Sequence, residues 1–189
     1  MLSSARNSPM MKIEQLIVGG LETNCYILKT ENIGIIIDPA AEPKKIIKTV
    51  AGDEIKLILA THRHYDHITA LKEVKEATNA KAAIHPLDWM PEFDLKLKDG
   101  QKIEFAKHQI TVLHTPGHTP GGCCFLVGDI LFSGDTLFPG GPGNTSFPGG
   151  SEQAILKSIR EKLLILPDDT KVYPGHGPAT TIGKERRLY

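Results

Sequence analysis

Four potential metal ligands fall within six consecutive residues of this chain, in the sequence THRHYDH of residues 61–67. They are His62, His64, Asp66 and His67. The apolar run before them, residues 56–60, is typical of a buried strand, so the cluster begins where a strand ends. In extended backbone, residues two apart point to the same side, so His62 and His64 can bind one ion together. Asp66 and His67 follow at the turn into the next helix, where they can point to a second ion nearby.

Three later segments share one design, an apolar run followed by glycine and a single ligand candidate. They are TPGHTPG at residues 115–121, SGDT at 133–136 and PGHG at 174–177, and they offer His118, Asp135 and His176. A lone residue of this kind is more often a surface or turn residue. With the first cluster, however, they make a set of seven, which is what two metal ions need if one carboxylate bridges them. Imidazole and carboxylate without thiolate suit a catalytic site that holds zinc, iron or manganese.

The rest of the chain shows short apolar runs separated by turn signals. Strands are predicted at residues 12–18, 24–30, 33–37, 56–60, 82–84, 102–105, 109–113, 122–127, 130–132 and 171–173. Helices are predicted from Pro43, over residues 68–79, and from Ser151 to Pro167, with a Gly/Pro-rich loop at 134–150. We expect a single domain at residues 11–189, preceded by a disordered extension at 1–10 that carries no function.

Composition excludes several classes of protein. The chain has 189 residues, of which 40% are hydrophobic and 23% charged, as in globular domains. Lys plus Arg and Asp plus Glu both number 22, so no charge excess points to nucleic acid or a membrane as partner. No apolar run approaches the roughly 20 residues that span a bilayer. The three cysteines, with Cys123 and Cys124 adjacent in an apolar run, predict core residues in a reducing compartment, hence a cytoplasmic protein.

The order HxHxDH, TPGHTPG, SGDTLF, PGHGP resembles the metallo-β-lactamase superfamily, over about residues 11–187. It is most similar to the short, single-domain proteins related to glyoxalase II (hydroxyacylglutathione hydrolase). The resemblance implies an α/β fold, a four-layer αββα sandwich in which two mixed β-sheets are flanked by helices. It places the metals at one edge of the molecule, between the two sheets.

The resemblance also implies a role for each motif residue. His62, His64 and His118 would hold the first of two divalent metal ions, and Asp66, His67 and His176 the second, with Asp135 bridging and Asp38 supporting the site from outside. The implied activity is hydrolysis of acyl-glutathione or a related small thioester by a hydroxide that bridges the metals. Asp66 would be the catalytic residue that orients this hydroxide. Zinc is the expected metal, with iron or manganese as alternatives.

The substrate is less constrained than the metals. Glyoxalase II carries a C-terminal helical domain whose basic residues bind glutathione, and this sequence shows no match to that domain. In addition, Gly143-Asn144-Thr145 stands where short relatives have Gly-Arg-Thr. Lys184, Arg186 and Arg187 either supply positive charge for the substrate or form a solvated basic tail. The sequence leaves the physiological substrate, the native metal and the oligomeric state open.

Alternatives to the thioesterase remain open at this point. They are a mono-iron persulfide dioxygenase and a lactonase or other ester hydrolase of the same superfamily. A β-lactamase fits less well, because the broadest lactam hydrolases usually lack a histidine at the position of His67. A flavin-linked di-iron redox module and a non-catalytic metal-binding protein are also less favoured.

Several residues outside the motifs receive weaker assignments. Phe138 and Phe147 flank the Gly-rich loop and are candidates for lining the substrate pocket. Trp89 and Phe93 either cap that pocket or face the core. We expect His85, His108 and His114 to be structural or surface residues.

Overall fold

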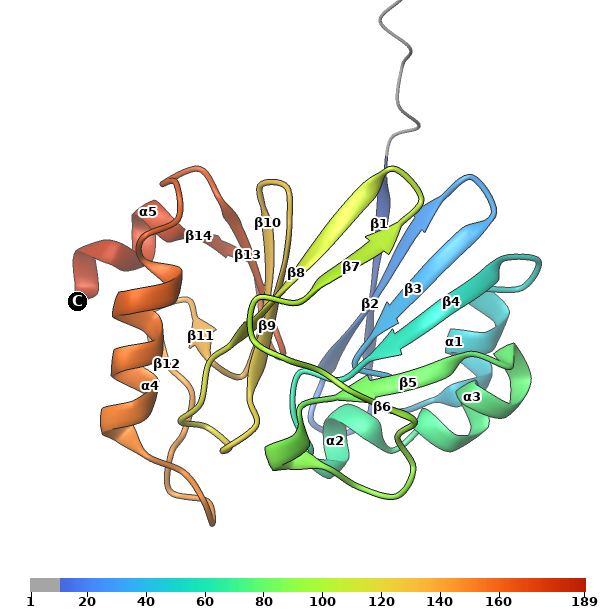
Figure 1. Ribbon diagram of the computed structural model, residues 1–189, viewed down its shortest axis with the longest axis horizontal. Helices are drawn as coiled ribbons and strands as arrows, with labels where there is room; N and C mark the ends of the chain where they lie inside the picture. The colour runs from blue at the N-terminus through green and yellow to red at the C-terminus, as the bar shows by residue number, and fades with distance from the viewer. Residues whose placement is uncertain (1–10) are drawn as a thin grey trace, which may run out of the picture.

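The computed structural model describes residues 11–189; the extension expected at residues 1–10 lies outside the described residues. Two six-stranded sheets face each other, and helices cover their outer sides (Figure 1). In spatial order the first sheet contains β1 (Lys12–Val18), β2 (Thr23–Thr30), β3 (Ile33–Ile37), β4 (Glu54–Leu59), β5 (Lys81–Ile84) and β6 (Leu95–Lys96). The second contains β14 (Thr180–Thr181), β13 (Lys171–Pro174), β10 (Ile130–Gly134), β9 (Cys123–Val127), β8 (His108–His114) and β7 (Lys102–Phe105).

The first sheet is mixed, antiparallel from β1 to β3 and parallel from β3 to β6. Its apolar strands are buried on both faces, as central parallel strands are. In β3, Ile35 and Ile37 point between the sheets and Ile36 points outward, because side chains alternate along a strand. The outward face is covered by α1 (Pro43–Thr49) and α3 (Leu71–Thr78), which contribute Ile46 and Val74 to its core.

The second sheet follows the same rule. Cys123 packs between the sheets, whereas its neighbour Cys124 packs outward against the helical layer. That layer is α4 (Glu152–Ser158), which continues as a π-helical turn, η2 (Ile159–Leu163). All three cysteines of the chain are free and buried, so the prediction of core residues is confirmed. Burial raises the pKa of Cys124 to about 11, which keeps it a neutral thiol.

The layer between the sheets holds the bulkiest side chains, including Phe105, Phe125 and Phe132. Tyr26 of the first sheet packs on Phe132 of the second with ring centroids 5.0 Å apart. Its hydroxyl donates to the carbonyl of Pro174 at 2.6 Å, which ties the end of β13 to the first sheet. The predicted four-layer αββα sandwich with two mixed sheets is confirmed.

The structure differs from the predicted elements in a few places. The helix predicted at residues 68–79 corresponds to α3, and a separate short helix that was not predicted, α2 (Tyr65–Ile68), precedes it. The two are distinct because the Ala70 N–H bonds to the carbonyl of Pro39 instead of continuing α2. The predicted loop at 134–150 contains a small hairpin of β11 (Leu137–Phe138) and β12 (Gly141–Pro142).

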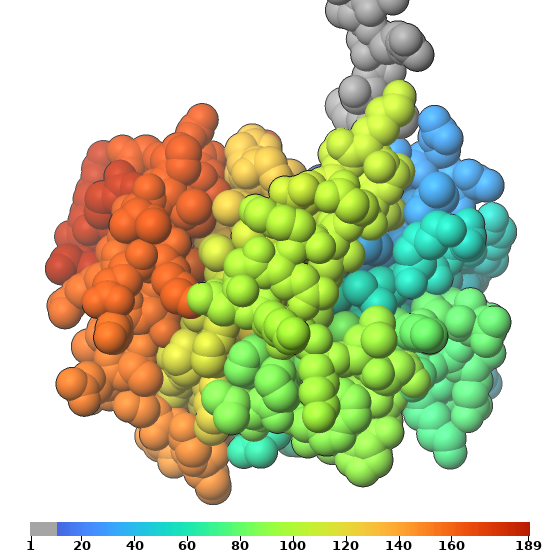
Figure 2. Space-filling view, viewed as in Figure 1, coloured from blue at the N-terminus to red at the C-terminus, as the bar shows by residue number. Residues whose placement is uncertain are grey.

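Other short elements were not predicted. They are η1 (Pro86–Asp88), β6, β14, α5 (Ile182–Glu185) and η3 (Arg186–Leu188). In the space-filling view, the yellow-green segment that includes β7 covers the middle of one face, between the N-terminal half and the C-terminal helices (Figure 2). Among residues 11–189, no helix has the length and apolar character needed to cross a bilayer.

Candidate metal centre

The structure brings all seven predicted ligands together at one edge of the sandwich. The contributing segments are the turn after β4, α2, the loop between β8 and β9, the end of β10 and the loop after β13. Of these, α2 lies at the lower edge between the two sheets (Figure 1). Potential ligand atoms form three overlapping groups, each within 4.8 Å: His62, His64 and His118; His62, His67 and Asp135; Asp66, His67 and His176.

The first group consists of three imidazoles. Nδ1 of His64 lies 3.1 Å from Nε2 of His62 and 2.9 Å from Nε2 of His118. The rings stand nearly perpendicular to one another, at 82° to 88°. Three ring nitrogens that converge in this way match the three-histidine set of catalytic zinc sites.

The second group combines two imidazoles with a carboxylate. Nε2 of His67 lies 3.3 Å from Nε2 of His176. Oδ2 of Asp66 lies 3.2 Å from Nε2 of His176 and 3.5 Å from Nε2 of His67. Asp66 and His67 are neighbours in α2, which begins directly after His64, so the change from extended to helical backbone directs them to this second point.

Asp135 lies between the two groups. Its Oδ1 is 3.4 Å from Nε2 of His67, and its Oδ2 is 3.4 Å from Nε2 of His118. Oδ1 is buried and has no hydrogen-bond partner among residues 11–189. Buried acceptors almost always have partners, and a cation held by the surrounding ligand atoms would supply one. The residues present therefore fit metal ions.

The outward-facing nitrogens of the histidines are held by other groups. Nδ1 of His118 bonds to the carbonyl of Asn144 at 2.6 Å, and Nδ1 of His176 to the carbonyl of Leu21 at 2.9 Å. Because a carbonyl only accepts, each Nδ1 carries a proton, which leaves Nε2 of each ring as the atom that can bind a metal once that nitrogen is deprotonated. Such outer partners fix ring orientation in metal sites.

Asp38 supports the cluster from the loop after β3. Its carboxylate accepts from the N–H of Thr61 at 2.7 Å, from the Thr61 hydroxyl at 2.7 Å and from Nδ1 of His67 at 2.9 Å. Because the Thr61 hydroxyl donates to Asp38, its oxygen accepts from Nδ1 of His62, 3.0 Å away. Asp38 adopts a left-handed φ of 51°, which is uncommon for a residue other than glycine. The structure thus places Asp38 outside the cluster, as the resemblance implies, and shows that it contacts His67.

Charge within the cluster is uneven. Burial lowers the pKa of His62 well below its usual value, and the neighbouring histidines lower it further. Burial also acts to lower the pKa of His67, but the charges of Asp135 and Asp38 outweigh it and raise the pKa to about 10. Burial acts to raise the pKa of Asp66, yet its hydrogen bond from His176 and the charge of His67 bring it to about 2. Asp66 is therefore ionised at neutral pH.

A cavity of about 670 Å³ opens over the cluster. Its lining residues are Leu21, His64, Tyr65, Asp66, His118, Asp135, Phe147, Pro148 and His176. The ring of Phe147 stands edge-on to His64, with centroids 5.2 Å apart. Phe147 lines the cavity as predicted, whereas Phe138 is not part of the lining and stacks on His176 with centroids 6.5 Å apart. A second hollow of about 430 Å³ adjoins the first and shares Leu21, Tyr65 and Asp66 with it.

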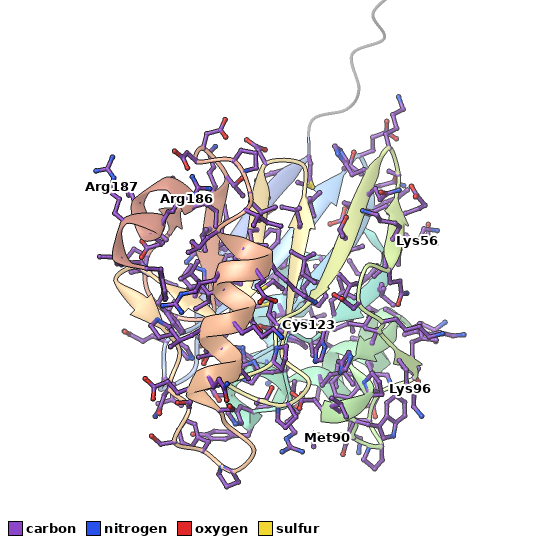
Figure 3. All side chains as sticks on the ribbon, turned by 60° about the vertical axis from the view of Figure 1, so that its left-hand side comes forward. Lys56, Met90, Lys96, Cys123, Arg186 and Arg187 are labelled. Atoms are coloured by element: carbon purple, nitrogen blue, oxygen red, sulfur yellow. The ribbon has the colours of Figure 1, made fainter. Side chains whose placement is uncertain are left out.

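The basic C-terminal residues Lys184, Arg186 and Arg187 were expected either to supply charge for the substrate or to form a solvated tail. Arg186 donates to the carbonyls of Leu164 and Leu166, and Arg186 and Arg187 lie beside the C-terminal helices (Figure 3). None of the three basic residues lines the cavity. Asn144 turns its side chain to the N–H of Ser146 at 2.9 Å, while its carbonyl holds His118.

The aromatic and histidine candidates outside the motifs lie apart from the cavity. Phe93 is 3% exposed and belongs to the core, which excludes a capping role. Trp89 lies under the ammonium group of Lys96, 5.0 Å from the ring centroid. His114 stacks on His85 with centroids 3.9 Å apart.

Two residues near the cluster were not predicted from the sequence. The Thr61 hydroxyl bonds both His62 and Asp38, and the Thr23 hydroxyl is 3.4 Å from Asp66. Neither residue stands out in the sequence.

Two facing mixed sheets with a His/Asp cluster at one edge define a metallo-β-lactamase fold. The family model of the metallo-beta-lactamase superfamily matches residues 18–176, and the chain belongs to this superfamily, whose members include metal-dependent hydrolases.

Curated relatives match almost the whole chain. An uncharacterised protein of Aquifex aeolicus is 37% identical over 93% of this chain and 94% of its own length. The probable metallo-hydrolase YqgX of Bacillus subtilis is 33% identical over 93% and 95%. The hydroxyacylglutathione hydrolase GloC of Haemophilus influenzae is 34% identical over 94% and 96%.

Solved structures agree with these matches. ETHE1 from Myxococcus xanthus has a TM-score of 0.88 at 31% identity, covering 94% of this chain and 83% of its own. BLEG-1, a B3 metallo-beta-lactamase, has a TM-score of 0.86 at 30% identity over 93% and 97%. TTHA1623, solved in a di-iron-bound form, has a TM-score of 0.82 at 35% identity over 93% and 98%.

Proposed function

We propose that this protein is a binuclear metal-dependent thioesterase of glyoxalase II type, acting on acyl-glutathione or a related small thioester. The observation that carries the proposal is the buried, unpaired Oδ1 of Asp135, placed between two complete three-ligand groups. A site for one ion would need only one of these groups. The similarity to GloC supports the choice of a thioester among the substrates of the superfamily.

Each residue has a defined task in this proposal. His62, His64 and His118 would hold one metal, and Asp66, His67 and His176 the other, with Asp135 shared. Two divalent cations held by these residues would lower the pKa of a bound water towards neutrality and polarise the substrate carbonyl. Asp66 stays ionised because its pKa is about 2, so its carboxylate can accept a hydrogen bond from the attacking water and orient it. A thiolate leaves without protonation, so no general acid is required.

The cavity suits a small substrate with an apolar portion. Leu21, Tyr65, Phe147 and Pro148 supply apolar surface beside the cluster. Tyr65 and Phe147 are 71% and 48% exposed, so both have surface left for a substrate to cover. Zinc is the proposed metal, with iron as the alternative that the di-iron form of TTHA1623 supports. We also propose a cytoplasmic location, since all three cysteines are free.

The test pairs metal content with thioester hydrolysis. Purified protein is analysed for transition metals and assayed with S-lactoylglutathione and with the lactoyl thioester of N-acetylcysteamine, following thiol release. We expect close to two metals per chain and turnover of at least one thioester. A fully loaded protein that hydrolyses neither thioester contradicts the proposal.

A persulfide dioxygenase is the second candidate, supported by the structural similarity to ETHE1. It predicts oxygen uptake and sulfite formation from glutathione persulfide by iron-loaded protein. The same preparation should be tested with a lactone and a β-lactam, because the metal ligands alone do not distinguish these hydrolases.

A further inference from the structure

A second buried carboxylate, Asp88, lies beside the candidate metal centre without belonging to it. Asp88 is the last residue of η1, which follows β5 of the first sheet. Its side chain is fully buried, at 0% exposure, and is not part of any of the three ligand groups. Burying a carboxylate is costly unless its oxygens accept hydrogen bonds, so its partners indicate what it is for.

The partners of Asp88 come from the two segments that carry the first ligand group. Oδ2 accepts from the N–H of Arg63 at 3.2 Å and from the hydroxyl of Thr119 at 2.6 Å. Oδ1 accepts from the N–H of Gly121 at 2.9 Å. Arg63 stands between His62 and His64, and Thr119 directly follows His118. One carboxylate is thus bonded to the immediate neighbours of all three histidines.

Consecutive residues of the turn at 61–64 have different roles in this arrangement. His62 and His64 face the cluster, whereas Thr61 and Arg63 present hydrogen-bond donors to Asp38 and Asp88. Asp38 fixes the first half of the turn and Asp88 the second half. The side chain of Arg63 adds a weaker contact, with Nε 3.9 Å from Oδ1 of Asp88.

The loop between β8 and β9 is shaped to admit this carboxylate. A Cβ on Gly121 would lie 2.6 Å from Cβ, Cγ and N of Asp88, which no side chain can occupy. Glycine at position 121 therefore lets the loop approach close enough to bond Asp88. A backbone bond from Cys123 N–H to the carbonyl of Thr61, 2.8 Å, joins the same two segments further along.

We propose that Asp88 is a positioning residue for the first metal. It fastens the turn that carries His62 and His64 to the loop that carries His118, and so fixes the separation of the three imidazoles. The turn follows the first sheet and the loop belongs to the second, so this geometry depends on a link across the sandwich. The proposal concerns metal binding and does not depend on which substrate is hydrolysed.

The test uses two isosteric substitutions. Asp88→Asn places an NH₂ group where one of the present donors needs an acceptor, and Thr119→Val removes only the hydroxyl beside His118. We expect Asp88→Asn to weaken binding of one zinc equivalent by about 10- to 100-fold in chelator competition, the range typical of outer-shell partners. We expect Thr119→Val to weaken it by a smaller factor and Thr119→Ser, which keeps the hydroxyl, to restore it. The visible spectrum of the Co²⁺-substituted protein should change in the same order.

A matched control separates positioning from general destabilisation. Glu185 is also a buried carboxylate that accepts from a threonine hydroxyl, Thr180 at 2.6 Å, and a backbone N–H, Gly140 at 2.9 Å. It contacts neither segment of the first group. Glu185→Gln should lower the melting temperature but leave zinc affinity and the Co²⁺ spectrum unchanged. Wild-type affinity and spectrum in folded Asp88→Asn, or in Thr119→Val if Asp88→Asn does not fold, would overturn the proposal. If the wild-type protein binds zinc but hydrolyses no thioester, the proposed function is wrong and the role of Asp88 in metal binding is unaffected.

Discussion

Asp38 reaches His67 from 29 positions away in the sequence, with Oδ2 accepting from Nδ1 at 2.9 Å. The bond directs Nε2 of His67 toward Asp66, Asp135 and His176. The same carboxylate holds Thr61 through both its N–H and its hydroxyl. Asp38 therefore orients one histidine directly and a second, His62, through Thr61.

Asp38→Asn tests this role. Asparagine tolerates the left-handed backbone at this position, but its amide offers one acceptor oxygen where three donors now converge. We expect metal affinity to fall by about 10- to 100-fold, as for other outer-shell partners, measured by chelator competition. Asp94→Asn is the control. The Asp94 carboxylate accepts from the N–H of Ala82 at 2.8 Å and is not part of the cluster, so this variant should bind metal normally. Equal affinities in the two variants would refute the role.

Substitution of the ligands themselves should have a larger effect. His62→Ala and Asp135→Asn each remove an atom that the cluster needs, and we expect loss of metal together with loss of turnover well beyond the roughly 100-fold of an outer partner. The fold should remain, because the central core does not depend on these residues. Circular dichroism, elemental analysis and thioester assays on the same sample measure all three. Full activity in either variant would show that the proposed mechanism is wrong.

Metal binding should depend on pH through His67. In the metal-free protein Asp135 and Asp38 overcome the effect of burial and raise the pKa of His67 to about 10, so this imidazole is protonated at neutral pH. A ligand must be deprotonated, so binding releases this proton, and affinity should rise up to about tenfold per pH unit below that pKa. His62 contributes no proton, because burial lowers its pKa.

The stability of the metal-free fold should change with pH in the opposite direction to metal affinity. A raised pKa stabilises the metal-free fold fully below the usual histidine pKa, and this contribution is lost as the pH rises through about 10. Proton release on adding zinc in weakly buffered solution measures the first effect, and chemical denaturation of metal-free protein at several pH values the second. Affinity that does not change between pH 6.5 and 8.5 would contradict this assignment.

Phe147 should affect substrate binding more than chemistry. Its ring stands edge-on to His64 and His118, with centroid distances of 5.2 and 6.0 Å, and the residue lines the cavity and is 48% exposed. Phe147→Ala removes apolar surface worth about 1–2 kcal/mol to a bound acyl group, so we expect KM to rise about tenfold with kcat little changed. Phe147→Leu should lie between the two proteins. A fall in kcat with unchanged KM would assign the ring to the chemistry instead.

Gly175 leaves space that Asp135 occupies. A Cβ at this position would collide with Oδ1 of Asp135 and lie 2.6 Å from Cε1 of His67. Gly175→Ala should therefore displace the shared carboxylate and abolish binding of two metals, as measured by elemental analysis. Gly20→Ala is the control, since no atom lies within 4 Å of a Cβ there. Normal metal content in Gly175→Ala would show that Asp135 does not bridge.

The sequence alone predicted most strands and all seven residues of the cluster, and the resemblance to the superfamily implied the αββα sandwich. Apolar runs bounded by turn residues are a local signal, and the ligand types cluster densely in residues 61–67, so the strands and the cluster could be found without a structure. The separation of the short helix α2 from α3 could not, because it depends on a bond from the N–H of Ala70 to the carbonyl of Pro39 in another loop.

Only the tertiary structure decided how the cluster is held. Asp88 lies in the sequence LDWMPEFD, where it resembles any loop carboxylate, yet it bonds residues 25 to 33 positions away. The protonated nitrogen of His176 is set by the carbonyl of Leu21, 155 positions distant. Sequence patterns report which side chains can bind a metal, whereas their orientation depends on long-range hydrogen bonds that form only when the two sheets pack together.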